Sequence, residues 1–316
     1  MPNTPHLRLF LSADLAGSTS FKQSRKSAEW QRFFTQFYRQ LPAYLQEKKQ
    51  GRAGCDKLNL WKTVGDEIVF STPLASAAMV PHCVAAFRQA VAAYRRETIE
   101  STKGLDIKCA GWTAGFPVGN LEVTLPTPGS AQLDYIGPGM DIGFRLVKHA
   151  SPRKMLLAVE LAYLLTIPQL GQGPAIFMDA GMFLKGVARD QTYPCLWLDN
   201  FLDDRHHGGR EEIELAEEKV RETVRKSCLA PGLHKYCARW LRDMGEPFLI
   251  PFIDGDPHVG TRPENFARLL ADVSASTQGA EELAGRTPVM KGAKVGKESI
   301  LGALDERLAS KLPAPE

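Results

Sequence analysis

The feature that most constrains the fold is a short apolar run at residues 7–13, which leads directly into Asp14 and a turn of small residues at 16–19. An apolar run of this length that ends in turn residues predicts a buried β-strand. A second signal follows at residues 57–71, where two apolar segments flank Val64-Gly65-Asp66 and predict a β-hairpin with Asp66 at its tip. Each of the two acids is therefore expected where a strand meets a turn.

The segments that follow alternate in type along the chain. Residues 27–49 repeat apolar side chains at helical spacing, with Pro42 as a kink or break, and a further helix is expected to start near Pro138 and run through Arg145. The other expected elements are helices at 75–94 and 156–165, strands at 107–115, 121–125 and 193–198, and a loop at 126–131. This order predicts an α+β domain of ferredoxin-like type, with its helices on one face of the sheet.

Chain length and composition indicate the domain organisation. The 316 residues are 44% hydrophobic and 24% charged, which is ordinary for globular proteins and excludes a fully disordered or coiled-coil chain. This length suits about two domains of ordinary size. Residues 199–210 are polar and glycine-rich, so we expect a first domain at 1–200 and a mainly helical C-terminal extension at 201–316. Helices are expected in that extension at 211–225, 233–244 and 264–273.

The sequence does not predict a membrane segment or export. The most apolar stretch, residues 155–167, has 13 residues and contains Glu160, whereas a membrane-spanning helix needs about 20 apolar residues. The first residues lack the basic start, apolar run and cleavage site of a secretory signal, so we expect a cytoplasmic protein. The six cysteines are scattered without zinc-ligand spacing and are interpreted as small buried apolar residues.

Charge is distributed unevenly along the chain. Residues 1–200 carry 22 basic and 16 acidic side chains, and residues 201–316 carry 17 and 20. The positive excess in the first part favours a polyphosphate ligand. No dense stripe of Lys and Arg alternates with aromatic residues, so an extended nucleic acid is not an expected partner.

Asp14 and Asp66 are the first candidates for chemistry. They are 52 residues apart, and neighbouring strands can bring them to one edge of a sheet. Paired carboxylates there suit two Mg²⁺ or Mn²⁺ ions about 3.5–4 Å apart, one polarising an attacking hydroxyl and the other neutralising a polyphosphate leaving group. Gly17, Ser18 and Thr19 can offer backbone N–H groups to phosphate oxygens. Either acid alone is equally well explained as a turn former or helix cap.

Asp141 and Arg145 are the second candidates. They are four residues apart, so a helix places them on one face. A guanidinium at that position can fork onto the oxygens of a pentavalent phosphorus. Taken without other motifs, the pair is better explained as a solvated ion pair worth about 0.3–0.5 kcal/mol.

Four motifs in sequence order resemble those of one enzyme family. They are Ala13-Asp14-Leu15-Ala16-Gly17-Ser18-Thr19-Ser20-Phe21, then Lys62-Thr63-Val64-Gly65-Asp66-Glu67, then Asp134-Tyr135-Ile136-Gly137 followed by Asp141 and Arg145, then Leu184-Lys185-Gly186-Val187. Each motif alone is weak, but the ordered set resembles the class III nucleotidyl cyclases over residues 7–199. The resemblance implies a cyclase catalytic domain that makes a 3',5'-cyclic nucleotide and pyrophosphate from a nucleoside triphosphate. It leaves the C-terminal part unmatched.

The resemblance also implies roles for the residues of the first motifs. Asp14 and Asp66 match the family's metal-binding positions for two Mg²⁺ or Mn²⁺ ions, with the carbonyl of Leu15 as a further ligand. Lys62 and Asp134 match the two positions that read the base.

The later motifs match the positions that act on the phosphates. Arg145 matches the transition-state arginine, and Lys185 resembles the lysine that holds the terminal phosphates. In this family the metal acids and the Arg/Lys set come from opposite subunits, so the resemblance implies a homodimer with shared active sites. Asp141 stands where the family usually has an asparagine that orients the ribose, and an ionised carboxylate cannot donate a hydrogen bond. The segment 115–137 is also longer than in common cyclases.

The base is the open question. Lys62 offers donors and Asp134 offers acceptors, which suits adenine and cytosine alike, whereas uracil reverses the two groups. Candidate walls of the base pocket are Arg52, Lys57, Trp61 and Tyr135. Over its whole length the chain resembles most the bacterial cyclases that make cyclic UMP or cyclic CMP during phage infection and activate a neighbouring effector, and we expect UTP ahead of CTP. The alternatives are an adenylate cyclase that uses ATP and a cyclase-fold protein that binds nucleotide without turnover.

Overall fold

The computed structural model describes residues 4–99, 101–102, 104–127, 130–171, 173–187, 191–201, 230–260 and 262–286. The chain forms two compact units, residues 1–270 and 271–316. The expected helix at 211–225 lies outside the described residues, as does most of the expected domain boundary at 199–210. The division at residue 200 therefore stays a prediction.

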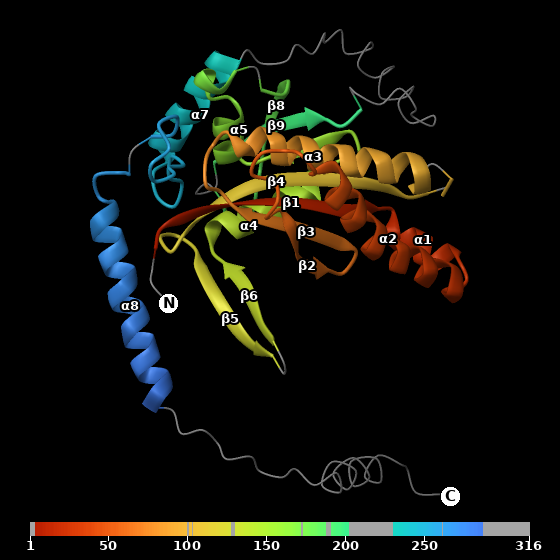
Figure 1. The fold of residues 1–316 in the computed structure, drawn as a ribbon, viewed down its shortest axis with the longest axis horizontal. Coiled ribbons are helices and arrows are strands. Elements are labelled where there is room, and N and C mark those ends of the chain that lie inside the picture. Colours follow the sequence, from red (N-terminus) through yellow and green to blue (C-terminus); the bar gives the residue numbers. More distant parts are fainter. Residues whose placement is uncertain are drawn as a thin grey trace, which may run out of the picture. The chain divides into compact units, whose positions relative to one another are not determined.

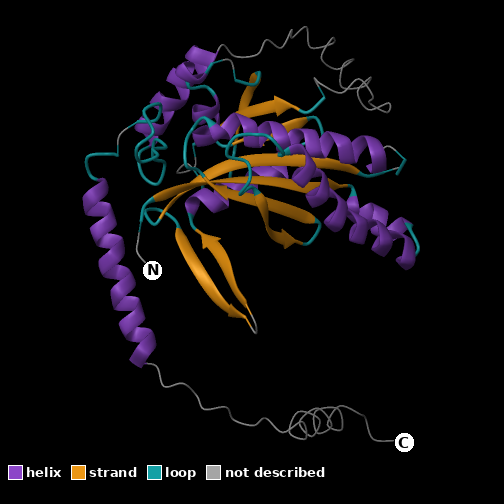
Figure 2. Cartoon of the chain, viewed as in Figure 1, coloured by secondary structure: helices purple, strands orange, loops and turns teal. Residues whose placement is uncertain are grey.

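Seven strands of the first unit form one mixed sheet, and two more form a separate hairpin (Figure 2). The sheet has the order β2-β3-β1-β4-β7-β9-β8, and every neighbouring pair is antiparallel except the parallel pair β4–β7. The strands are β1 (His6–Ala16), β2 (Asn59–Val64), β3 (Glu67–Pro73), β4 (Asp106–Phe116), β5 (Leu121–Thr127), β6 (Ser130–Ile136), β7 (Lys154–Leu157), β8 (Ile176–Met182) and β9 (Tyr193–Asp199).

Helices connect the strands. They are α1 (Ser18–Ser24), α2 (Ser27–Lys48), α3 (Met79–Tyr94), the π-helix η1 (Arg95–Ile99), α4 (Pro138–His149), α5 (Val159–Leu165), the 3-10 helix η2 (Pro168–Leu170), α7 (Ala230–Met244) and α8 (Phe266–Arg286). The order β2-β3-β1-β4, with helices between β1 and β2 and between β3 and β4, is the ferredoxin-like arrangement. The predicted α+β class and the helical C-terminal region are confirmed.

The helices cover both faces of the sheet, not one face as expected. A side chain added at Gly111 of β4 would meet Leu161 of α5, whereas one added at Gly143 of α4 would meet the ring of Trp112. Consecutive residues of a strand point to opposite faces, so α5 and α4 lie on opposite sides of β4. Figure 1 shows α2 and α3 on one side and α4 with the β5–β6 hairpin on the other. Gly143 lacks a Cβ, and this lets α4 approach Trp112 closely enough to cover that face.

The central strand is buried on both faces. Leu9, Phe10, Leu11 and Ala13 of β1 are all fully buried, which explains why the run at 7–13 is continuously apolar instead of alternating. The strand continues to Ala16. Asp14 therefore lies inside β1, two residues further from the turn than the sequence indicates.

Two prolines expected to break or end an element lie inside one. Pro42 lies within the continuous helix α2, where Leu41 and Leu45 are fully buried, so packing outweighs the lost hydrogen bond. The expected loop at 126–131 is wrong, because Pro126 pairs with Ala131 in the β5–β6 hairpin. A two-stranded hairpin has open edges, and proline is tolerated there because its missing N–H breaks no ladder bond.

Two segments, near residue 156 and at residues 176–182, also differ from the prediction. Residues 154–157 form strand β7, and helix α5 begins only at Val159. Both pieces are buried, so the apolar pattern does not reveal the change of type between them. Strand β8 is not predicted, because it lies at the edge of the sheet with exposed positions such as Met178.

Helix α7, which belongs to the C-terminal region, packs against α5 within the first unit. The ring of His234 stacks on Tyr163 at 4.3 Å, and its Nδ1 lies 3.1 Å from the Tyr163 carbonyl oxygen. The five described cysteines are buried, as expected, and none of these five forms a disulfide; Cys228 lies outside the described residues. In the part of the chain that the structure describes, no helix is long and apolar enough to span a bilayer.

Candidate functional site

Asp14 and Asp66 lie together at one end of the sheet. Asp14 on β1 is opposite Glu67 on β3 in the strand register, and the Leu15 amide donates to the Asp66 carbonyl at 3.4 Å. In an extended strand the N–H and C=O of one residue point to the same neighbour, so the Leu15 carbonyl also faces the Asp66 side. The hairpin turn therefore brings the second acid to the first.

Two further charged residues, Glu67 and Lys108, complete this cluster. Asp14 is opposite Lys108 on β4, and the Lys108 ammonium lies 2.9 Å from Asp14 Oδ2. Ser12 donates to Glu67 Oε1 at 2.6 Å. Neither residue is among the predicted site residues. Glu67 is nevertheless the last residue of the motif that begins at Lys62, and Lys108 lies in the strand expected at 107–115.

The pKa of Glu67 reflects the charges of this cluster. Burial above all, together with the negative charges of Asp14 and Asp66, raises the pKa of Glu67 to about 7 against the opposing effects of Ser12 and Lys108. Tyr38 of α2 donates its hydroxyl to the Gly65 carbonyl, and burial together with both acids raises the pKa of that phenol. The negative charges of Asp14 and Asp66 therefore raise the pKa of both Glu67 on β3 and Tyr38 on α2.

The small-residue turn follows directly on this end of β1. Gly17 has a φ of 84°, and a Cβ on it would lie 2.3 Å from the Gly104 carbonyl oxygen, so the turn requires glycine. Ser18 is buried and Thr19 is exposed at the start of α1, a helix of seven residues. Phosphate binding by Gly17, Ser18 and Thr19 remains a prediction.

Lys62 and Asp134 pair directly although 72 residues separate them in the chain. The Lys62 ammonium lies 2.7 Å from Asp134 Oδ1 and 2.9 Å from Oδ2, and both side chains are about one quarter exposed, at 22% and 24%. The pair joins β2 to the β5–β6 hairpin. A second bond does the same, because the Trp61 indole N–H donates to the Leu133 carbonyl at 2.9 Å.

Aromatic rings surround this pair. The Lys62 ammonium lies 4.7 Å from the centre of the Trp61 ring, and the Trp61 and Tyr135 rings are 4.9 Å apart. Arg52 does not belong to this wall, because its guanidinium bonds to the Lys48 carbonyl and the Gln89 side chain between α2 and α3. Lys57 is exposed in the segment before β2.

Asp14 and Lys62, the partner of Asp134, share one face of the sheet. Lys62 is opposite Val69, and Val69 is opposite Ser12, so these three point to the same face as Asp14 two residues further along β1. Two strand spacings across and two residues along place Lys62 about 12 Å from Asp14. That separation matches the span from a nucleobase to its phosphates.

Arg145 and Lys185 form a second group. The Arg145 Nε donates to the Lys185 carbonyl at 2.6 Å, and Nη1 donates to the Asp141 carbonyl at 3.2 Å. The Asp141 carboxylate lies 3.8 Å from Nη1, with 33% of the Arg145 side chain and 69% of the Asp141 side chain exposed. Lys185 is also exposed.

We name the two groups by the elements that carry them. The strand half is Asp14, Leu15, Lys62, Asp66 and Asp134; the helix half is Asp141, Arg145 and Lys185. Among the described residues no hydrogen bond or ion pair joins one half to the other. In the sheet order, β2, β3 and β1 lie on one side of β4, while β8, which precedes Lys185, is at the far edge.

The strand half offers only oxygen donors to a cation. Two carboxylates and one backbone carbonyl are the hard ligands that Mg²⁺ and Mn²⁺ prefer. No cluster of three or more His, Cys, Asp or Glu side chains suited to a metal occurs in the described ranges. Two carboxylates and one carbonyl fill only part of the coordination shell of Mg²⁺ or Mn²⁺, so phosphate oxygens and water would complete it.

The fold is similar to that of solved nucleotidyl cyclases. An adenylyl cyclase, CyaB from P. aeruginosa, is 13% identical over 61% of this chain and 94% of its own, with a TM-score of 0.49. The guanylyl cyclase Cya2 is 13% identical over 63% of this chain and 93% of its own, with a TM-score of 0.48.

A third similar structure is the guanylate cyclase domain of RhGC from Catenaria anguillulae, in complex with GTP. It is 8% identical over 61% of this chain and 97% of its own, with a TM-score of 0.48. No family model and no curated protein sequence matches the chain. These similarities concern the fold alone, and the chemistry is argued below from this chain's own residues.

Proposed function

We propose that this chain is a nucleotidyl cyclase that converts a nucleoside triphosphate into its 3',5'-cyclic nucleotide and pyrophosphate. One observation carries the proposal: Asp14, beside which the β2–β3 turn places Asp66, lies on the sheet face that also presents Lys62, the partner of Asp134. Carboxylates for metal-bound phosphates and a donor–acceptor pair for a base are thus about one nucleotide length apart.

The strand half would hold the substrate. Asp14, Asp66 and the Leu15 carbonyl would bind two Mg²⁺ or Mn²⁺ ions, which supply Lewis acidity at the 3'-hydroxyl and charge neutralisation at the leaving pyrophosphate. Lys108 neutralises part of the negative charge of Asp14 through its 2.9 Å ion pair. This pairing orients the Asp14 carboxylate before the substrate arrives.

The helix half would act on the phosphates. In the reaction a bond forms between the 3'-oxygen and the α-phosphorus, the bond from the α-phosphorus to the bridging oxygen breaks, and the hydroxyl proton is lost. The Arg145 guanidinium stabilises the charge that builds on the α-phosphate oxygens, and Lys185 pairs with the terminal phosphates. The Lys185 and Asp141 carbonyls hold Arg145 through backbone acceptors, which leaves part of its donor fork unoccupied.

The separation of the halves supports a homodimer with shared active sites. No hydrogen bond or ion pair joins the two halves among the described residues, and the helix half is more exposed than the strand half. A head-to-tail pair of chains would bring the strand half of one copy against the helix half of the second, and symmetry would build two equivalent sites.

For the base we propose a pyrimidine, with UTP ahead of CTP and ATP as the alternative. The Trp61 and Tyr135 rings at 4.9 Å and the closed Lys62–Asp134 pair support a narrow base site. The donor and acceptor of that pair favour adenine as well as cytosine, so base size would separate pyrimidine from purine. The order of UTP ahead of CTP rests on the family resemblance. That the product serves as a second messenger for a cyclic-nucleotide-activated effector in antiphage defence rests on the family resemblance alone.

The direct test supplies the purified chain with Mn²⁺ and each of the four ribonucleoside triphosphates and identifies the products by chromatography and mass spectrometry. We expect cyclic UMP or cyclic CMP together with pyrophosphate. Cyclic AMP as the sole product would replace the pyrimidine proposal with the adenylate one. Absence of any cyclic product, with nucleotide binding retained, would leave a non-catalytic binding protein and refute the cyclase.

A further inference from the structure

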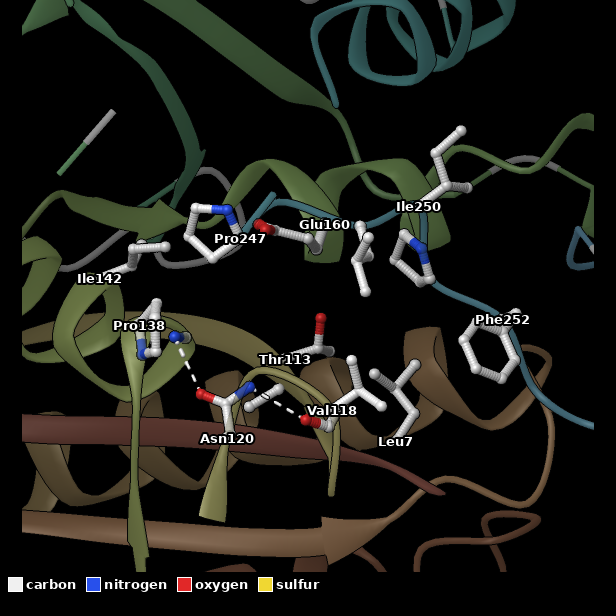
Figure 3. Close-up of a pocket in the computed structure, with 15 residues that line it drawn as sticks. Leu7, Thr113, Val118, Asn120, Pro138, Ile142, Glu160, Pro247, Ile250 and Phe252 are labelled. Carbon is white, nitrogen blue, oxygen red and sulfur yellow. Dashed lines mark hydrogen bonds between the residues drawn. The ribbon is translucent and has the colours of Figure 1, made fainter. Parts of the chain in front are cut away.

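A pocket lies far from the strand half of the candidate site and beside α4, the helix that carries Asp141 and Arg145 (Figure 3). One of its lining residues is Leu7, at the beginning of β1, whereas Asp14 lies near the other end of the strand. Seven residues of extended strand span about 23 Å. The pocket therefore does not share residues or space with the strand half.

Its walls come from elements distant in the sequence. They include Thr113 of β4, Ile142 of α4, Glu160 of α5 and the extended segment 247–252 after α7. The cavity between them measures about 60 Å³, enough for roughly four to six water-sized groups.

The covering segment 247–252 is fixed at both ends. Phe248 packs on the ring of Trp240 at 5.0 Å and on Tyr193 at 6.4 Å. Beyond the segment, Asp256 accepts a hydrogen bond from the Ala77 amide, just before α3, at 2.6 Å. The pocket is thus a built feature of the first unit, and not a gap under a loose tail.

Two polar groups that line this cavity have no hydrogen-bond partner among the described residues. Thr113 is only 5% exposed, and its buried Oγ1 has no hydrogen-bond partner among the described residues. The same holds for the buried Oε2 of Glu160. Figure 3 shows the Thr113 oxygen directed toward the space between the walls and the Glu160 carboxylate at its rim, beside Pro247. An unsatisfied buried polar group costs about 1–3 kcal/mol, so both oxygens are poised to accept donors.

The other polar side chain that lines the cavity is already satisfied. Asn120 Oδ1 accepts from the Gly139 amide at 3.0 Å, and its Nδ2 donates to the Gly115 carbonyl at 2.9 Å. These two bonds hold the start of α4 against the end of β4. Recognition in the pocket therefore falls to Thr113 and Glu160.

Glu160 also lacks a positive partner. No described Lys, Arg or His forms an ion pair with it, and burial raises its pKa to about 7. A cation in the pocket would supply the missing charge and favour the ionised carboxylate. A neutral ligand of the same shape would leave that charge uncompensated.

We propose that this pocket binds a small organic ammonium ion, with N–H donors to Glu160 Oε2 and Thr113 Oγ1 and an aliphatic stem against Leu7, Val118 and Ile142. The cavity volume fits a stem of about four carbon atoms. Charge-assisted hydrogen bonds from the ammonium would replace the two unmade bonds, and the stem would fill the apolar remainder.

The pocket adjoins α4, the helix that carries Arg145 of the helix half. Ile142 lines the pocket and lies one helical turn before Arg145 on α4. A ligand that packs on Ile142 is expected to slow amide hydrogen exchange along α4. An effect on turnover rests on the proposed function, but binding and exchange do not.

The test titrates the full chain with butylammonium chloride by isothermal calorimetry, beside butanol and sodium butyrate. We expect saturable binding of one butylammonium per chain, at least tenfold tighter than binding of either control. Glu160→Gln should weaken butylammonium at least tenfold and Thr113→Val several-fold. Asp243→Asn, which alters an exposed carboxylate on α7, should leave the affinity unchanged.

Butanol that binds as tightly as butylammonium, no saturable binding of butylammonium, or full affinity in Glu160→Gln would each overturn the proposal. If Glu160→Gln does not fold by circular dichroism, the wild-type comparison of the three probes and Thr113→Val decide. A chain that binds butylammonium but forms no cyclic product would refute only the cyclase, and a cyclase that ignores butylammonium would refute only this site.

Discussion

The strand half and the helix half differ in how firmly the chain holds them. In the strand half, side chains from separate strands pair with one another, as Lys62 does with Asp134 and Lys108 with Asp14. In the helix half, Arg145 is held by two backbone carbonyls and by a carboxylate at 3.8 Å that is mostly exposed. The half that would recognise substrate is organised before binding, whereas the half that would act in the transition state is left open for it.

This difference indicates which half depends on a second molecule. The pairs in the strand half are only about one fifth to one quarter exposed and are complete within one chain. Arg145, which is one third exposed, and the exposed Lys185 meet an anionic partner beyond Asp141 only when phosphates, or a second chain that carries them, are placed opposite. The predictions below test this contrast, starting with the largest expected effect.

Removal of an acid from the strand half should have the largest effect. Asp66→Ala should lower cyclic-nucleotide formation by about 1,000-fold or more, because the remaining carboxylate alone cannot hold the metal that neutralises the phosphates. Product formation checks the rate, and size-exclusion chromatography with light scattering checks that the oligomer persists. The matched control Asp56→Ala alters an exposed acid before β2 and should keep wild-type turnover; equal loss in both variants would contradict the assignment.

The helix half should affect rate more than binding. Arg145→Ala should lower kcat by about 100- to 1,000-fold with little change in KM, since the guanidinium matters most as charge develops at the α-phosphate. Steady-state kinetics with the preferred triphosphate measure both parameters. Lys148→Ala, an exposed basic residue on the same helix, should be unaffected. A rise in KM at constant kcat would instead make Arg145 a simple phosphate-binding residue.

The base-reading pair should control specificity, and not the rate of the preferred reaction alone. The double change Lys62→Gln with Asp134→Asn replaces a pure donor and a pure acceptor by two amides, so the ratio of kcat/KM for UTP over CTP should move by about 10- to 100-fold. Arg52→Ala should leave the ratio unchanged, because Arg52 contacts α2 and α3 and not this pair. An unaltered ratio in the double variant would remove the pair from base recognition.

The smallest effect concerns the pH dependence of stability. His6 Nε2 lies 3.1 Å from Glu122 Oε1, which ties β1 to the β5–β6 hairpin. The hydrogen bond that the His6 ring donates to Glu122 raises the pKa of His6 against the effect of burial, and the same bond lowers the pKa of Glu122. A raised histidine pKa contributes stability that is complete below the unfolded value of 6.5 and is lost as pH rises through the folded value.

Wild-type protein should therefore lose up to about 1 kcal/mol of unfolding free energy between pH 6 and pH 8.5 relative to Glu122→Gln. Urea denaturation at the two pH values measures the difference. A wild-type protein that gains stability over this range relative to the variant would contradict the pairing.

Local patterns in the sequence predict the first half of the fold well. The apolar run before Asp14 and the Val64-Gly65-Asp66 turn define β1 and the β2–β3 hairpin, because a strand buried on both faces and a glycine turn leave direct signals. The start of α4 at Pro138 is equally direct. These elements bring Asp14 to Asp66 through the register alone.

The remaining contacts depend on tertiary structure that no local pattern encodes. The Lys62–Asp134 bond requires the β5–β6 hairpin to reach β2, whereas the sequence predicts a strand only at 121–125, a loop at 126–131 and no second strand directly after it. Glu67 and Lys108 join the acids only through strand register. The pocket at Thr113 and Glu160 needs a segment from beyond residue 246 to cover it, so a linear pattern cannot indicate it.

The most direct test of the central claim mixes two inactive proteins. Asp66→Ala is defective only in the strand half, and Arg145→Ala is defective only in the helix half. In a mixed dimer, one site would combine the intact strand half of Arg145→Ala with the intact helix half of Asp66→Ala, and the other site would carry both defects. After subunit exchange, confirmed by native mass spectrometry, the equimolar mixture should recover about one quarter of wild-type turnover. No recovery in a mixture that has exchanged, or full turnover by a strictly monomeric wild-type chain, would contradict the account.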